Sequence, residues 1–160
     1  MISMIAKMAW IRRQEQENST CSDSECYEDL HVVGEDYLEA VLLLNRQKGN
    51  VRGVDLADFL ARSKPTITNM VTRLCECGFL IRDNDKYIHL TEKGKEIAEM
   101  IYERHEFISK WLISLGVSKE VALEDACRIE HVVSAKSFKA IKAHITEGHE
   151  LPDMEDPEHV

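Results

Sequence analysis

The chain has 160 residues, of which 44% are hydrophobic, so it can form one domain or two small domains that share an interface. With three prolines and seven glycines, the composition favours long helices and few loops. The formal net charge of −9 arises in two acidic segments, residues 14–30 and 146–160, which each hold six carboxylates and no base. Residues 1–13 add three bases, which leaves residues 31–145 formally neutral. A nucleic-acid partner is therefore not excluded, because bases can still gather on one face.

The cysteines and the N-terminus indicate a cytoplasmic protein. The five cysteines have no regular spacing, and an odd number does not suit a disulfide scaffold. At the N-terminus the bases follow a short apolar stretch, whereas in a secretory signal they precede it. No apolar run approaches the ~20 residues that a membrane-spanning helix needs. We therefore expect no membrane partner.

The first third of the chain predicts an extension and two helices. Residues 1–30 are polar and acidic with little periodicity, so we expect a flexible extension. Residues 34–48 form a strongly apolar helical pattern that Gly49-Asn50 ends. Residues 51–62 predict a shorter helix. The side chains that we expect on its inner face are Val54, Leu56, Ala57 and Leu60.

Residues 63–77 predict a helix with one buried face and one polar face. Ser63 is a favourable N-cap, and Pro65 is tolerated only in the first turn of a helix. The apolar residues recur at positions i, i+3, i+4 and i+7, which predicts one buried stripe. That stripe consists of Ile67, Met70, Val71 and Leu74.

The periodicity then changes from helix to strand and back. Residues 79–90 contain two short strand patterns around Asp83-Asn84-Asp85, whose side chains favour turns. Thr91 caps a long helix that runs to about Leu115 and has His105 within its apolar stripe. Two more helices are expected, from Ser118 to about Val133 and from there to about Ile145.

This order of elements predicts a mainly α fold. Three helices followed by a β-hairpin form a winged helix-turn-helix, and the remaining helices form a second, all-helical domain. The third helix of such a fold enters the major groove of DNA, where long side chains would hold it away from the bases. Short hydroxyls and amides contact phosphates and base edges directly.

The polar face of residues 63–77 has this character. Asn69 suits adenine, Arg73 suits guanine or a phosphate, and the hairpin offers Arg82 and Lys86 to the DNA backbone or minor groove. A merely solvated helix face is the alternative, and the hairpin that follows favours DNA binding over it. The candidate DNA-binding residues are Arg52, Lys64, Pro65, Thr66, Thr68, Asn69, Thr72, Arg73, Arg82 and Lys86.

Three of the expected helices carry side chains that bind divalent first-row metals. Cys127, Glu130 and His131 stand at i, i+3 and i+4, so a helix projects them from one face. Asp36 and Glu39 stand at i and i+3 on the first helix, and a histidine lies in the apolar stripe of the long helix. The six candidates are Asp36, Glu39, His105, Cys127, Glu130 and His131.

Each candidate also has an ordinary structural explanation. Asp36 and Glu39 fall in the first turn of the expected helix, where acids favour the helix dipole. His105 can be a satisfied core residue, and Cys127 can be a small buried hydrophobe. The neighbouring glutamate and histidine can be a surface pair. The occurrence of six ligand types on three helices that must pack together favours a metal site.

Other chemistries fit the sequence less well. Cys75-Glu76-Cys77 lacks the C-x-x-C spacing of a redox helix or zinc site, and thiols at i and i+2 point apart. A winged-helix regulator that senses oxidation of Cys75, Cys77 or Cys127 remains the alternative to metal sensing. The sequence holds no H-E-x-x-H motif, phosphate loop or nucleophile elbow. We therefore expect that the protein is not an enzyme. The alternative from that class is a small metallohydrolase.

Five segments carry a recognisable pattern: EDYLEAV (35–41), SKPTITNMVTRL (63–74), HLTEKGKEIA (89–98), YERHEFISKWL (102–112) and CRIEHVVS (127–134). Together they resemble the diphtheria-toxin-repressor (DtxR/MntR) family of metal-dependent transcriptional regulators. The resemblance covers residues 34–145 and implies metal ligands at the six candidate positions. It also implies a homodimer that binds palindromic operator DNA when loaded with Mn(II) or Fe(II) and controls metal-homeostasis genes.

The resemblance implies the short, two-domain form of the family. The expected division is a flexible extension (1–30), a winged helix-turn-helix DNA-binding domain (31–93), a helical metal-binding and dimerisation domain (94–146) and an acidic tail (147–160). No small-molecule substrate is implied.

The metal is left open by a mixture of two subtypes. Manganese-type members have Asp and Glu at the positions of Asp36 and Cys127, whereas iron-type members have Met and Cys. Ser109 and Leu123 stand where the iron type has a Glu and a His of an ancillary site. Co(II), Ni(II) or Zn(II) are expected to bind in vitro as well, since such donors do not select one ion.

Overall fold

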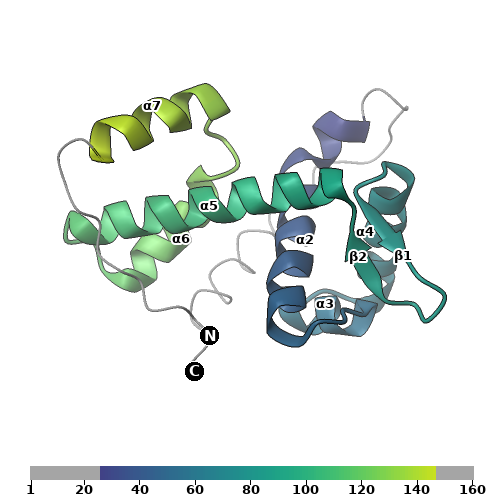
Figure 1. Cartoon of the computed structure of the whole chain (residues 1–160). Coiled ribbons are helices and arrows are strands. Elements are labelled where there is room, and N and C mark those ends of the chain that lie inside the picture. The colour runs from purple at the N-terminus through teal and green to yellow at the C-terminus, as the bar shows by residue number, and fades with distance from the viewer. Residues whose placement is uncertain (1–25, 147–160) are drawn as a thin grey trace. The chain divides into compact units, whose positions relative to one another are not determined.

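The computed structural model describes residues 26–146 (Figure 1). They divide inside the long helix α5 into two compact units, residues 26–100 and residues 101–146. Within the described residues the order is three helices, a β-hairpin and three helices, as predicted. None of the described helices is long and apolar enough to cross a membrane. Most of the predicted extension and acidic tail lies outside the described residues.

Helix α2, Cys26–Lys48, begins eight residues before the predicted start at residue 34. The predicted helix started at Gly34, and glycine in a helix interior costs about 1 kcal/mol relative to alanine. In the structure Gly34 is buried inside α2, where packing of the apolar residues that follow outweighs this local cost. The helix ends as predicted, because Gly49 has a φ of +81° and terminates it.

Helices α3 (Gly53–Leu60) and α4 (Lys64–Glu76) pack against each other. The predicted caps of α4 are confirmed, since the Ser63 hydroxyl accepts a hydrogen bond from the Thr66 amide at 3.3 Å and a proline occupies the first turn. Two predicted inward residues are wrong or only partly right. Val54 is 47% exposed, and Met70 is half-buried.

The hairpin pairs β1 (Leu80–Arg82) with β2 (Ile88–Leu90) in antiparallel register. A bridge from Val51 to Ile88 attaches the segment before α3 to the hairpin. The turn is held by Asp83, whose Oδ1 accepts a hydrogen bond from the Tyr87 amide at 2.8 Å. Strand β2 contacts α2, and strand β1 contacts α4, so the hairpin is part of the first unit's core.

The second unit contains the C-terminal part of α5 (Glu92–Ser114), α6 (Lys119–Ile129) and α7 (Ala135–Thr146) (Figure 1). Its core joins all three helices, and the rings of Phe107 and Phe138 meet edge to face with centroids 5.6 Å apart. Helix α6 ends at Ile129, four residues before the predicted end. The chain instead forms a turn over residues 130–133. Leu115, the predicted end of the long helix, is 63% exposed just beyond the end of α5.

Candidate DNA-binding face and metal ligands

Helix α4 presents the polar face that the sequence predicted for DNA contact. Ile67, Val71 and Leu74 are buried, so the opposite side of the helix faces outward. The exposed or half-exposed side chains there are Lys64, Pro65, Thr66, Thr68, Asn69, Thr72 and Arg73. Amide, hydroxyl and cationic groups of this size suit the major groove.

The threonines of this face are already engaged with their own helix. The Thr68 hydroxyl donates to the Lys64 carbonyl at 2.9 Å, and the Thr72 hydroxyl donates to the Thr68 carbonyl at 2.8 Å. The Thr66 hydroxyl lies 2.8 Å from the N-cap hydroxyl of Ser63. The hydroxyls of Thr68 and Thr72 have thus already used their hydrogens, whereas either hydroxyl of the Ser63–Thr66 pair can be the donor. Donation to phosphates and to base acceptors therefore falls mainly to the lysine, asparagine and arginine of the same face.

The remaining candidates for DNA contact belong to the hairpin and its neighbourhood. Arg82 and Lys86 are exposed on either side of the turn. The Arg52 guanidinium lies 4.5 Å from the centroid of the Tyr87 ring, which fixes a cation beside the hairpin. At the same turn Asp83 and His89 form an exposed pair at 2.9 Å, and the hydrogen bond from His89 holds the pKa of the Asp83 carboxyl below its ordinary value.

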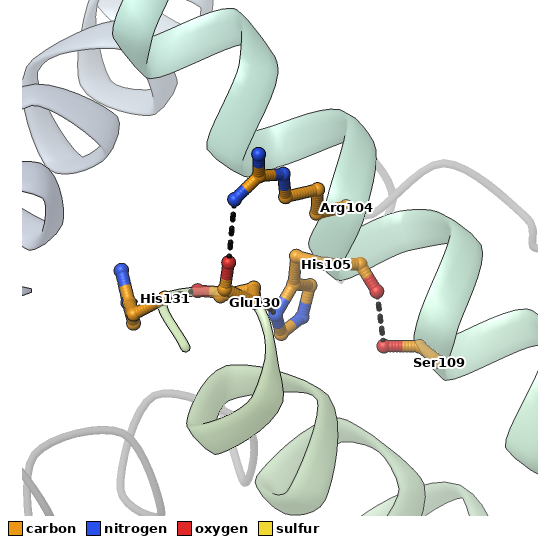
Figure 2. Close-up of polar contacts among 5 residues, drawn as sticks. All are labelled: Arg104, His105, Ser109, Glu130 and His131. Carbon is orange, nitrogen blue, oxygen red and sulfur yellow. Dashed lines mark hydrogen bonds and ion pairs between the residues drawn. The ribbon is translucent and has the colours of Figure 1, made fainter. Parts of the chain in front are cut away.

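Three of the metal-ligand candidates meet within the second unit (Figure 2). Oε2 of Glu130 lies 2.6 Å from Nδ1 of His105, and Oε1 of Glu130 lies 3.2 Å from Nε2 of His131. Glu130 is fully buried and His131 is 5% exposed, so the interpretation of these two as a surface pair is wrong. Burial of a carboxylate is costly unless it is paired, and here two imidazoles surround it.

Cys127 is 2% exposed in the last turns of α6, one helical turn before Glu130. It is a free thiol. The sequence placed Cys127, Glu130 and His131 on one continuous helical face, and the structure places the last two in the turn after α6. The Glu130 backbone keeps right-handed helical angles, which preserves the start of that face.

Arg104, which was not predicted to belong to the site, and Ser109, which was considered only for an ancillary site, lie beside this cluster (Figure 2). Nη1 of Arg104 donates to the carbonyls of Glu130, at 3.0 Å, and Val133, at 2.9 Å. The hydroxyl of Ser109 is buried and donates to the carbonyl of His105 at 2.7 Å. The available signal was the polar pair Arg104-His105 within an otherwise apolar helical stripe, since a buried arginine needs acceptors.

Asp36 and Glu39 lie on α2 in the first unit, one helical turn apart, and are 1% and 2% exposed. Because α2 starts at Cys26, both residues lie well past the first turn. The helix dipole acts only within the terminal turns, so it no longer accounts for these two acids.

The donor set fits a divalent metal ion. The described candidates offer carboxylate oxygens, imidazole nitrogens and one thiol sulfur, which are the usual donors for Mn(II), Fe(II) and the later divalent ions. Glu130, the carboxylate between two imidazoles, is fully buried.

The thiols at the end of α4 have no comparable surroundings. Cys75 and Cys77 are half-buried and are not joined in a disulfide bond, and burial raises the pKa of Cys75. The thiolate is the reactive form, so a raised pKa lowers reactivity near neutral pH. This observation counts against oxidation sensing at Cys75.

A winged helix-turn-helix joined to a helical domain with buried metal-ligand side chains defines a metal-dependent transcriptional regulator. Comparison with known families agrees. Residues 29–88 match the family described as iron dependent repressor, N-terminal DNA binding domain. Residues 91–155 match iron dependent repressor, metal binding and dimerisation domain. The chain belongs to this iron-dependent repressor family, to which the DtxR and MntR regulators belong.

Curated relatives are similar over most of their length. The chain is 36% identical over 108 residues to the transcriptional regulator MntR of Escherichia coli O157:H7, which covers 68% of this chain and 70% of that protein. It is 36% identical over 107 residues to the HTH-type transcriptional regulator MntR of Bacillus subtilis (strain 168), covering 67% of this chain and 75% of the relative.

Solved structures share the fold. The manganese regulator SloR has a TM-score of 0.64 at 24% identity, covering 74% of this chain and 55% of that chain. ScaR with bound Zn²⁺ has a TM-score of 0.60 at 28% identity, covering 69% of this chain and 52% of that chain. The present chain therefore spans about half the length of these solved structures.

Proposed function

We propose that the protein is a cytoplasmic repressor that binds palindromic operator DNA as a homodimer when it is loaded with Mn(II) or Fe(II), and that it controls metal-homeostasis genes. The observation that carries the proposal is the fully buried Glu130 carboxylate, which lies 2.6 Å from a nitrogen of His105 and 3.2 Å from a nitrogen of His131. This cluster falls in the part of the chain that matches a metal-binding and dimerisation domain.

The proposed ligands are the six residues that the sequence predicted. His105, Cys127, Glu130 and His131 would hold the ion from the second unit, and Asp36 and Glu39 would add two carboxylates from α2. What supports this set is its chemistry and the burial of both acids on α2. The resemblance of EDYLEAV and CRIEHVVS to the family's ligand segments supports the same assignment.

Mn(II) and Fe(II) are the proposed native metals. ScaR, a solved relative at 26% identity, is described as a manganese-activated repressor. Carboxylates and imidazoles suit both ions, whereas the thiol of Cys127 favours softer or later metals. Co(II), Ni(II) and Zn(II) should therefore bind in vitro, and the metal supply of the cell would choose among them.

A bound divalent cation would supply the positive charge that lets several buried carboxylates remain together. The residues of the chain perform the rest. Asp36 and Glu39 restrain α2, which belongs to the same unit as the recognition helix α4. Ordering of this unit reduces the conformational entropy that DNA binding must still remove. A coupling of about 1–3 kcal/mol would tighten operator binding about 5–150-fold.

The proposed DNA contact places α4 in the major groove. Asn69 and Arg73 would contact base edges, and Lys64, Arg82 and Lys86 would contact phosphates. A two-fold symmetric dimer presents two such helices, so its operator should be palindromic, with half-sites about one helical turn apart or a multiple of it.

The proposal is tested by a metal titration of DNA binding. Random duplex DNA is first selected on the protein with Mn(II) under reducing conditions, and the selected duplex is then titrated by fluorescence anisotropy with Mn(II), Fe(II), Co(II) and Zn(II). We expect at least one metal to tighten binding about 5–150-fold, and bound duplex to tighten metal binding by the same factor.

Two results would contradict the proposal. Equal metal affinity with and without the selected duplex would exclude the coupling. Oxidation sensing would be supported instead if DNA binding did not depend on metal and a thiol oxidant abolished it. In that case a triple variant, Cys75→Ser with Cys77→Ser and Cys127→Ser, should still bind DNA in the presence of the oxidant.

A further inference from the structure

A single buried arginine connects α5 to the turn that carries two of the proposed metal ligands. Arg104 is 5% exposed, and its Nη1 donates to the Glu130 carbonyl at 3.0 Å and to the Val133 carbonyl at 2.9 Å. One guanidinium nitrogen thus uses both of its hydrogens on two carbonyls of the same turn. The guanidinium also lies 5.7 Å from the centroid of the Phe138 ring on α7.

The position of these two carbonyls gives the contact its effect. Glu130 is the C-cap residue of α6 and Val133 lies in the turn beyond it, so both carbonyls must be satisfied by donors from outside the helix. A guanidinium is permanently charged and donates strong, directed hydrogen bonds. The two acceptors, on Glu130 and Val133, lie on either side of His131 in sequence. The arginine therefore holds the backbone of the turn at both ends.

The same helix also contacts the turn through a side chain. His105 follows Arg104 in the sequence, and neighbours on a helix point in directions about 100° apart. Arg104 holds the backbone of Glu130, whereas His105 contacts its carboxylate at 2.6 Å. Two independent contacts from α5 thus define where the Glu130 oxygens lie (Figure 2).

We propose that Arg104 is a positioning residue of the metal site: by clamping the turn over residues 130–133 onto α5, it sets the Glu130 and His131 donor atoms for metal before any ion binds. This inference rests on the proposed function. Residues that do not bind the metal but hydrogen-bond to its ligands orient those ligands, and their removal typically weakens metal binding about 10–100-fold.

The test compares three full-length variants. Arg104→Met keeps a long apolar stem against Phe138 but removes every donor, and Arg104→Lys keeps the charge and a terminal donor. Phe107→Leu is the matched control, because it loosens the same core while removing no hydrogen-bond donor to the turn. Co(II) affinity is measured from its visible absorption at a temperature where all variants are folded by circular dichroism. Amide exchange of residues 130–133 is measured on the metal-free proteins.

We expect Arg104→Met to bind Co(II) about 10–100-fold more weakly, with faster exchange at the amides of Val132 and Val133. Arg104→Lys should recover part of the affinity, and Phe107→Leu should remain within about threefold of the wild type. Wild-type affinity and exchange in a folded Arg104→Met would overturn the proposal, as would an equal loss in Phe107→Leu. If Arg104→Met does not fold, a wild-type Co(II) affinity in Arg104→Lys together with wild-type exchange would overturn it.

Glu130→Ala separates this inference from the proposed function. Weak Co(II) binding in Glu130→Ala with normal binding in Arg104→Met would refute only the positioning role. Unchanged Co(II) binding in Glu130→Ala would refute the metal site itself.

Discussion

Nδ1 of His105 and Oε2 of Glu130 lie 2.6 Å apart, although 25 positions separate them in the sequence. The helix α5 supplies one group and the turn after α6 supplies the other. The pair brings a ring nitrogen and a fully buried carboxylate oxygen to one point within a single unit. Both atoms are ordinary metal ligands, so protons and metal ions should compete for them.

Glu130→Gln should weaken metal binding and leave the fold intact. The amide has nearly the shape of the carboxylate but lacks its charge, and it is a poorer ligand for a divalent cation. Calorimetry should show at least a 10-fold loss of Mn(II) and Co(II) affinity, which is the lower end of the range for changes at a metal site. The melting temperature should stay close to that of the wild type. The control is Glu120→Gln, an exposed acid in the first turn of α6. Equal losses in the two variants would mean that only net charge matters.

Metal binding should release protons and weaken as the pH falls. The imidazole and thiol ligands must be deprotonated at the coordinating atom, so acid favours the metal-free protein. Calorimetric titrations with Mn(II) at one pH, in two buffers of different ionisation enthalpy, measure the number of protons released. We expect net release, and a smaller value for His105→Ala. A heat of binding that does not depend on the buffer would contradict this.

Asn69→Ala should weaken binding to the selected duplex by about 1–3 kcal/mol and relax its sequence preference. The reason is that Asn69 is exposed on the outer face of α4, where its amide can contact a base edge. Lys86→Ala on the hairpin is the comparison. Loss of a phosphate contact should weaken binding to all DNA sequences alike, and it should lower the slope of log affinity against log salt concentration by about 1. Anisotropy titrations at several salt concentrations distinguish the two. Metal affinity should change in neither variant.

Gly94→Ala should destabilise the first unit. A Cβ at Gly94 would lie 2.0 Å from the carbonyl oxygen of Phe79, which no side-chain motion can relieve. The approach is fixed by Thr91, whose hydroxyl accepts from the Gly94 amide and lies within hydrogen-bond distance of the Phe79 carbonyl. We expect a loss of about 1–3 kcal/mol or more in urea unfolding, as for other overpacked sites. Gly49→Ala, with open space around its Cβ but a φ of +81°, should cost less.

His89→Ala, which removes the donor, should raise the pKa of Asp83 toward its ordinary value. In the wild type the hydrogen bond from His89 lowers this pKa, and the Tyr87 amide adds to the effect. A carboxyl whose pKa is lowered in the folded state stabilises the hairpin above its unfolded pKa, and this contribution disappears as the pH falls through the folded value. Carboxyl carbon shifts followed by NMR over an acid titration give both values. An unchanged Asp83 titration in the variant would exclude the pairing.

Local sequence signals predicted the order of elements because their causes are local. Ser63, Pro65 and Thr91 mark helix starts through hydrogen bonds and backbone angles that span one turn. The change from helical to strand periodicity marked the hairpin. Boundaries failed where packing decided them. Helix α2 starts at Cys26 rather than at Gly34, and α6 ends at Ile129, where Arg104 from α5 contacts the turn that follows.

By itself, the sequence determined the winged helix-turn-helix with a polar face on its third helix, and the six ligand types that the resemblance assigned to metal binding. These depend on residue identity and on short spacings, which a linear pattern contains. Only the tertiary structure decided that Glu130 is fully buried, that His105 meets its carboxylate and that Arg104 holds its carbonyl. Contacts between residues about 25 positions apart depend on how α5 and α6 pack, and no local spacing specifies that packing.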